Sequence, residues 1–170
     1  MDLLALATAG LLSLAAAAPG SAAPVGPNRN ATAAADIRPP ATLRKLEDLN
    51  FGCLSVTTAG TATVDPNTDA VTTTGGVIRA GCLAYAALFE AVSPVKGVVI
   101  VRIPRQPITV TRAGGTETMT VSNWTMSGNS NRTVAALEPF AFSVGGRLAV
   151  NANQAEGLYT GTFLVEIQYP

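Results

Sequence analysis

Side chains that could carry out chemistry are few in this chain of 170 residues. It contains no His, which is the commonest general base, the usual partner of a nucleophilic Ser or Cys and the commonest metal ligand. The 11 basic and 11 acidic side chains give a net charge of zero, so no basic field is available to follow a nucleic-acid backbone. The composition therefore predicts a protein that is not an enzyme, needs no cofactor and binds no nucleic acid.

One segment has the spacing of a calcium-binding loop. Residues 65–69 read Asp-Pro-Asn-Thr-Asp, and oxygen ligands at alternate positions can converge on one ion. The sixth position is Ala70, where such loops need Gly, and the twelfth is Gly76, where they need a bidentate Glu. We therefore expect a plain turn and no metal site.

The first residues have the pattern of a secretory signal. Residues 3–18 form an apolar run, and Pro, Gly, Ser and Ala follow it, as in a cleavage region. The run is shorter than the roughly 20 apolar residues of a membrane-spanning helix, although Met1 and Asp2 lack the positive charge that usually precedes a signal. We predict a signal peptide at 1–22, cleaved after Ala22, and no membrane span in the mature chain.

Export changes the interpretation of the two cysteines, Cys53 and Cys82. In an oxidising compartment an even number of Cys favours a disulfide. Two Cys without His or a C-x-x-C pair cannot supply four zinc ligands. We predict one disulfide between Cys53 and Cys82, with two buried free thiols as the alternative.

The mature chain divides into an extended segment and a strand-rich domain. Residues 23–46 contain much Ala and Pro and predict a linker or a donor strand. Near their end Leu43, Leu46 and Leu49 have helical spacing, for which we expect a strand or a short helical turn. Residues 47–170 are rich in Val, Thr and Ile, which predicts a β-domain.

Turn residues recur about every ten residues in this domain, as in antiparallel sandwiches. We therefore predict an all-β fold, an immunoglobulin-like or pilin-like antiparallel sandwich. The expected strands are 50–57, 60–65, 70–79, 84–92, 97–103, 107–112, 117–126, 138–144, 147–151 and 158–169. The expected turns are at 65–67, 93–94, 114–115, 128–129 and 145–146. In the last expected strand the odd-numbered residues from 159 to 169 share one face, and all except Gly161 are large and apolar, so this face should lie in the core.

Four segments resemble an uncharacterised family of bacterial secreted β-sandwich domains. They are VGGRLAVNANQAEGLYTGTFLVEIQYP at 144–170, DLNFG at 48–52, TTTGG at 72–76 and TMTVSNW at 118–124. That family is itself similar to fimbrial subunits and to the spore coat U type of surface protein. The resemblance covers about residues 43–170 and implies a secreted sandwich domain at the cell surface.

The C-terminus is also similar to that of pilins assembled by periplasmic chaperones and outer-membrane ushers. Such subunits end in a penultimate Tyr that follows alternating apolar residues and an upstream Gly. The matching residues here, the candidate assembly edge, are Gly157, Tyr159, Phe163, Val165, Ile167 and Tyr169. In such pilins a chaperone strand, and then the N-terminal extension of the next subunit, caps this edge. The alternative is an ordinary terminal core strand, which would alternate in the same way.

A donated strand would come from the N-terminal segment. The candidate donor residues on one face are Ala31, Ala33, Ala35 and Ile37, with Leu43 beyond two prolines. Alanines bury little apolar area, so this strand would bind weakly. A linker, or a first strand that closes the domain in cis, fits the same segment equally well.

Two functions fit these features. The first is a structural protein of the cell surface or of an extracellular fibre, in the periplasm or outside the cell, which assembles by strand donation with copies of itself or sibling subunits and engages a periplasmic chaperone. The second is a monomeric secreted module that recognises a glycan or surface partner through loops at one end of the sandwich. Trp124 is the candidate sugar-binding platform for the second function, although a single aromatic residue more often belongs to the core.

Overall fold

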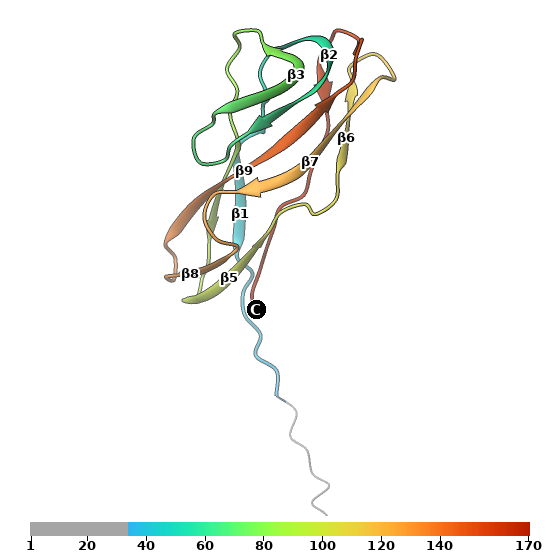
Figure 1. Ribbon diagram of the computed structural model, residues 1–170. Coiled ribbons are helices and arrows are strands. Elements are labelled where there is room, and N and C mark those ends of the chain that lie inside the picture. The colour runs from blue at the N-terminus through green and yellow to red at the C-terminus, as the bar shows by residue number, and fades with distance from the viewer. Residues whose placement is uncertain (1–33) are drawn as a thin grey trace, which may run out of the picture. The chain divides into compact units, whose positions relative to one another are not determined.

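Antiparallel strands form all the regular structure of residues 34–170, the part of the chain that the computed structural model describes (Figure 1). The strands are β1 (Thr42–Glu47), β2 (Leu54–Val64), β3 (Val71–Arg79), β4 (Ala87–Val92), β5 (Gly97–Arg102), β6 (Ile108–Arg112), β7 (Thr118–Met126), β8 (Asn131–Val134), β9 (Pro139–Val150), β10 (Tyr159–Thr160) and β11 (Glu166–Gln168). The described residues include no helix, and hence none that could cross a membrane. The predicted all-β antiparallel fold class is confirmed, whereas the predicted signal peptide lies outside the described residues.

Two sheets face each other in this fold. The large sheet has the order β1-β4-β9-β7-β6-β10, and the β2–β3 pair joins it through β2 and β9. The small sheet has the order β11-β5-β8. Strand β9 is central because it pairs with β7 on one side and with both β4 and β2 on the other.

The first four strands form one long two-stranded ribbon, which we call the N-terminal ribbon (residues 42–92). Strand β1 pairs with β4, β2 pairs with β3, and a bridge between Asn50 and Tyr85 continues the ladder between these two pairs. The ribbon turns back at Asp65-Pro66-Asn67, where the Asn67 amide donates to Asp65 Oδ1 at 2.8 Å. Pro and Asx turns favour this local geometry, and the predicted turn is present.

A second ribbon, the C-terminal ribbon, joins the two sheets. Strand β5 pairs with β11 in the small sheet, and β6 pairs with β10 in the large sheet. Between these pairs, residues 103–107 and 161–165 belong to no strand. Pro104 and Pro107 lack the amide hydrogen that a ladder requires, which explains the interruption.

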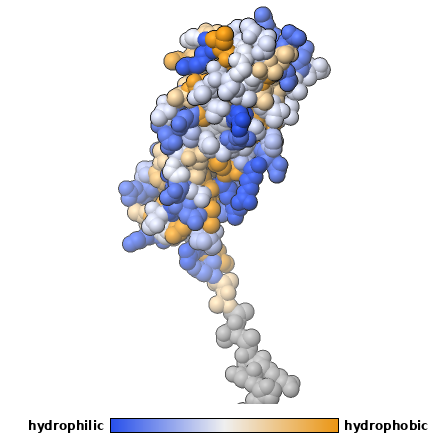
Figure 2. All heavy atoms as spheres, viewed as in Figure 1, coloured by the Kyte–Doolittle hydropathy of each residue, from blue (hydrophilic) through white to orange (hydrophobic). Residues whose placement is uncertain are grey.

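Alternating apolar residues of the two sheets build the core. One cluster contains Ala87, Phe89, Ala91, Val101, Phe142, Val144 and Val165, and the other contains Ala62, Val77, Met119, Val121, Leu148 and Val150. Trp124 packs against both clusters, with its ring 4.8 Å from that of Phe163. On the face in Figure 2, the hydrophobic residues that reach the surface lie in small patches among hydrophilic ones.

Several expected elements differ from the observed ones. Gly145 and Gly146 were expected to form a turn but lie inside β9. A side chain at Gly145 would collide with the carbonyl oxygen of Val64, so this glycine permits a close approach of β2. Strand β8 was not expected. Strand β1 belongs to the sandwich, although residues 23–46 were assigned to the extended segment.

Candidate assembly interface

The C-terminal residues alternate between core and solvent. Phe163, Ile167 and Tyr169 are half-buried and Val165 is buried, as is usual for one face of an extended strand. Tyr159 is half-buried too, whereas Gly157 is exposed and precedes β10. The even-numbered residues from 158 to 170 are exposed, which includes two leucines.

This segment is not the single strand that was expected over 158–169. It is divided into β10, which pairs with β6, and β11, which pairs with β5. Residues 161–165 between them make no backbone ladder with any described residue. The candidate assembly edge is therefore one apolar row that spans two sheets.

Strand β11 has a free outer edge. It is the terminal strand of the small sheet, and β1 contacts it without forming a ladder. The Val101 amide donates to Ser130 O, so the backbone groups of Val101 point toward β8 and those of Arg102 point toward β11. The backbone groups of Glu166, the partner of Arg102, therefore point toward β5. The backbone groups of Ile167, one residue further, consequently point to the outer edge.

The penultimate residue, Tyr169, ties together three parts of the chain. Its hydroxyl hydrogen is directed at two acceptors, Ser93 Oγ at 3.1 Å and Pro39 O at 3.3 Å. Ser93 is fully buried and donates to Val95 O at 2.6 Å within the β4–β5 turn. The sequence indicated Tyr169 but not Ser93, which was noted only as part of a turn.

The candidate donor residues fall into three groups. Ala31 and Ala33 lie outside the described residues. Ala35 and Ile37 are exposed and belong to no strand, and the Ile37 side chain is 93% exposed. Leu43 lies in β1, opposite Ala91 of β4, and packs against the core of its own chain. A donor segment would therefore have to precede β1.

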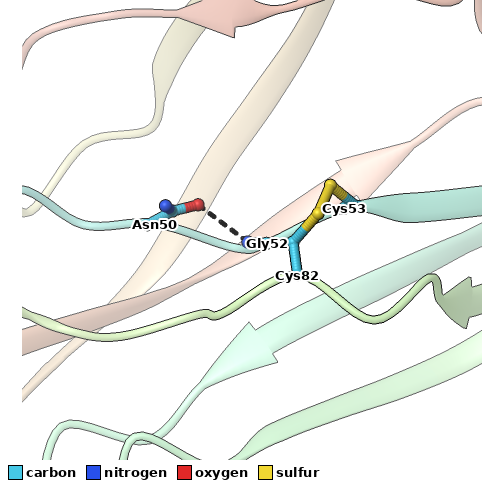
Figure 3. The surroundings of a disulfide bond; sticks show 4 residues. All are labelled: Asn50, Gly52, Cys53 and Cys82. Atoms are coloured by element: carbon cyan, nitrogen blue, oxygen red, sulfur yellow. Dashed lines mark hydrogen bonds between the residues drawn. A yellow bond between two sulfur atoms is a disulfide. The ribbon is translucent and has the colours of Figure 1, made fainter.

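The two cysteines form a disulfide (Figure 3). Cys53 and Cys82 have a Cα–Cα distance of 5.0 Å, and both residues are exposed. They cross-link the N-terminal ribbon between the bridge at Asn50 and the start of the β2–β3 ladder. Gly52 adopts a positive φ of 74°, and its amide donates to Asn50 Oδ1 at 2.8 Å. The disulfide links the two strands of the ribbon where the backbone ladder between them is interrupted.

A family model for a domain of unknown function, DUF4402, matches residues 41–169. The chain belongs to this family. The match begins one residue before β1 and ends at Tyr169, so it covers the whole sandwich. No curated protein and no solved structure matched the chain, and no match linked it to fimbrial subunits or to spore coat U proteins.

In the DUF4402 domain, the residues of the calcium-like motif stabilise the turn between β2 and β3. Asp65 Oδ1 accepts the Asn67 amide, and Asp69 Oδ1 accepts the Ala86 amide at 2.8 Å. Asp69 has a positive φ of 58°, which Asp tolerates. Residues 34–170 contain no cluster of three or more His, Cys, Asp or Glu side chains that could hold a metal ion.

Two surface hollows flank residues 103–107 of the DUF4402 domain. One is lined by Ile103, Pro104, Arg105, Pro107, Ser122, Asn123 and Trp124. Trp124 is half-buried, and its Nε1 donates to Gln106 O at 3.1 Å. Because its ring packs on Phe163 and its N–H is engaged, Trp124 is mainly a core residue.

The second hollow, which we call the C-terminal hollow, lies between residues 103–108 and the C-terminal segment. Its apolar lining is Ile103, Pro104, Pro107, Ile108, Phe163 and Leu164. Arg102, Arg105 and Glu166 are its charged residues. It marks the interruption of the C-terminal ribbon.

Arg112 and Arg132 stabilise turns elsewhere in the domain. Arg112 pairs with Glu117 across the β6–β7 hairpin, with Nε at 2.7 Å from Oε2. The hydrogen bond from Arg112 lowers the pKa of Glu117 and raises that of Arg112. Arg132 donates to the carbonyl oxygens of Ser127, Asn129 and Ala141, and burial lowers its pKa. These contacts hold the turns of the domain in place.

Proposed function

We propose that this DUF4402 protein is a non-catalytic, exported structural protein of the cell surface or of an extracellular fibre, and that it assembles by strand addition at β11. The observation that carries the proposal is the free outer edge of β11, with a row of inward apolar side chains along the same segment. An extended peptide that pairs with such an edge gains main-chain hydrogen bonds and side-chain contacts at alternate positions. The disulfide supports export.

The longer edge strands β1 and β3 are less suited to strand addition than the short strand β11. The edge strand β1 carries Arg44, Lys45 and Glu47, and charged side chains discourage pairing at an edge. The edge strand β3 is kinked at Gly75, which has a φ of 64° opposite a bulge in β2. Strand β11 has neither a bulge nor a proline within its bounds.

The donor in this proposal is the N-terminal segment of a neighbouring copy. The Ile37 side chain is 93% exposed, so it is available to contact a neighbouring copy. Because β1 already pairs within its own chain, the donor comprises residues before β1, up to Ile37. A periplasmic chaperone would cover the same edge before assembly.

Point variants of the exported full chain test this proposal by light scattering over a concentration series. Ile167→Pro removes the amide that faces the outer edge, and Ile37→Asp places a charge on the donor. We expect the unmodified chain to polymerise and both variants to remain monomeric. Ile167→Val keeps the amide and should polymerise, and the melting temperature of each variant reports its folding. Polymers of unchanged length from both variants would refute strand addition at β11.

A secreted binding module is the second candidate, favoured by the hollow at Trp124. Arg105, Ser122 and Asn123 bring polar groups beside an aromatic ring, a combination that suits a sugar. A glycan that binds there should raise the melting temperature in proportion to its concentration and quench the fluorescence of Trp124. A panel of surface glycans that changes neither quantity would refute this alternative.

A further inference from the structure

Leu137, in the turn between β8 and β9, has an unusual backbone conformation. Its φ is 63°, in the left-handed region, and its side chain is 73% exposed. Among residues 34–170, the other non-glycine residues with positive φ are Asp69, Asn123 and Asn153, which belong to the types that tolerate this region. Leu137 therefore carries a conformational cost without gaining burial inside its own chain.

Such a cost is easy to avoid, because Gly or Asn at this position of a turn would remove it. Strained residues that persist often serve an interaction. The Leu137 amide donates to Ser93 O at 2.8 Å, and Ser93 in turn holds Tyr169. The backbone beneath the leucine is thus fixed to a buried turn, so its side chain is presented from a rigid base.

The C-terminal hollow offers a complementary surface. It is lined mainly by apolar residues, and Leu164 at its margin is 69% exposed. Its charged residues are two arginines and one glutamate, so the rim carries a net positive charge. Glu138 directly follows Leu137 and is exposed. An apolar residue beside a carboxylate therefore fits an apolar hollow with a basic rim.

The two surfaces cannot meet within one molecule. Leu137 is bonded to the β4–β5 turn, which precedes β5, whereas the hollow begins where β5 ends. Six residues of strand separate these points by about 20 Å. Figure 1 shows β5 and β8 at the end of the sandwich near the C-terminus, away from β6.

We propose that Leu137 of one copy inserts into the C-terminal hollow of a second copy, with Glu138 against Arg105. The contact is heterologous, since it joins two different surfaces, and it can therefore repeat along an open chain. This inference rests on the proposed function, because both require copies of this chain to associate. It adds a side-chain contact that uses neither the outer edge of β11 nor residues before β1.

Mixing two variants of the exported full chain tests this contact. Leu137→Asp removes the inserted residue but keeps the hollow, and Leu164→Asp blocks the hollow but keeps the inserted residue. We expect each variant alone to associate at least about tenfold more weakly than the unmodified chain, as for loss of one buried leucine contact. An equal mixture should associate more strongly than either variant alone, as measured by light scattering, because Leu137 of one variant can enter the intact hollow of the other. Leu158→Asp, equally exposed at 69%, is the matched control and should associate normally.

Two further variants separate a contact from a structural role. Leu137→Gly should raise the melting temperature, because strain is relieved, while it weakens association.

Glu138→Arg and Arg105→Glu should each weaken association, and a mixture of the two variants should restore it. A mixture of Leu137→Asp and Leu164→Asp that associates no more strongly than either variant alone overturns the proposed contact. If Ile167→Pro abolishes assembly while Leu137→Asp and Leu164→Asp assemble normally, strand addition stands without this contact. If only the Leu137 and Leu164 variants lose assembly, this contact stands and strand addition fails.

Discussion

The N-terminal and C-terminal ribbons differ at the point where the backbone ladder of each is interrupted. Each is a long antiparallel pair whose ladder is interrupted midway. In the N-terminal ribbon the interruption is closed by the Cys53–Cys82 disulfide and by the bridge between Asn50 and Tyr85. In the C-terminal ribbon two prolines remove amide donors, and residues 161–165 remain outside any strand.

We infer from this difference that the N-terminal ribbon mainly stabilises the domain and that the C-terminal ribbon mainly offers a surface for association. A closed interruption leaves few backbone groups for another chain to reach, and the cross-link reduces the entropy of the unfolded chain. The open interruption leaves backbone groups and the exposed Leu164 beside an apolar hollow. We therefore expect substitutions in the N-terminal ribbon to change the free energy of unfolding most, and substitutions along the C-terminal ribbon to change association most.

The largest expected effect comes from removing the disulfide. With a sequence separation of 29 residues, the chain-entropy model gives a loss of about 3.5 kcal/mol for the double substitution Cys53→Ala and Cys82→Ala. Urea unfolding followed by Trp124 fluorescence measures this loss. Reduction of the unmodified protein should give a similar value. A loss below about 1 kcal/mol would mean that the ribbon is held by its ladder and not by the cross-link.

A smaller loss is expected where the tip of the N-terminal ribbon packs on β9. In Gly145→Ala the new methyl group would collide with Val64 O and would lie 2.9 Å from Pro66 Cδ. Overpacking of this kind costs about 1–3 kcal/mol. Gly97→Ala is the matched control, because nothing lies within 4 Å of its added carbon. Equal melting temperatures for the two variants would contradict the close approach of β2 and β9.

The sequence predicts the fold class well because strand patterns are local. The period-two alternation and the turn at 65–67 depend on neighbouring residues, and both are present. The alternation from Tyr159 to Tyr169 also appears in the burial of these residues. Local patterns therefore identified the apolar row of the candidate interface.

Features that depend on distant contacts escaped prediction. Gly145 serves an approach by β2 that is remote in sequence, so a turn was the natural but wrong interpretation. The division of the last strand depends on Pro104 and Pro107, which lie more than 50 residues upstream. Ser93 becomes a partner of Tyr169 only after the chain folds. The periodicity of a single sequence gives no information about contacts between residues that lie so far apart in the chain.

An intermediate effect is expected at the junction of the two ribbons. Tyr169→Phe keeps the ring but removes the hydroxyl that bonds Ser93 and Pro39. Loss of these partly buried hydrogen bonds should cost about 1 kcal/mol. Thermal unfolding measures the cost, and Tyr85→Phe is the comparison because no side-chain hydrogen bond from Tyr85 occurs in residues 34–170. A Tyr169→Phe variant as stable as Tyr85→Phe would show that Tyr169 does not tie β11 to the N-terminal ribbon.

The smallest expected effect concerns the partly exposed ion pair that closes the β6–β7 hairpin, which adjoins the C-terminal ribbon through β6. The hydrogen bond from Arg112 lowers the pKa of Glu117 in the folded state. A lowered folded pKa means that the pair stabilises the protein above the ordinary Glu pKa of about 4.3 and that this contribution is lost as pH falls through the folded value. Glu117→Gln should therefore melt slightly below the unmodified protein at pH ~7, and the difference should shrink as the pH falls below the ordinary Glu pKa. A difference that persists at low pH would assign the effect to packing of the side chain, and the stability of the β6–β7 hairpin would then not depend on its charge pair.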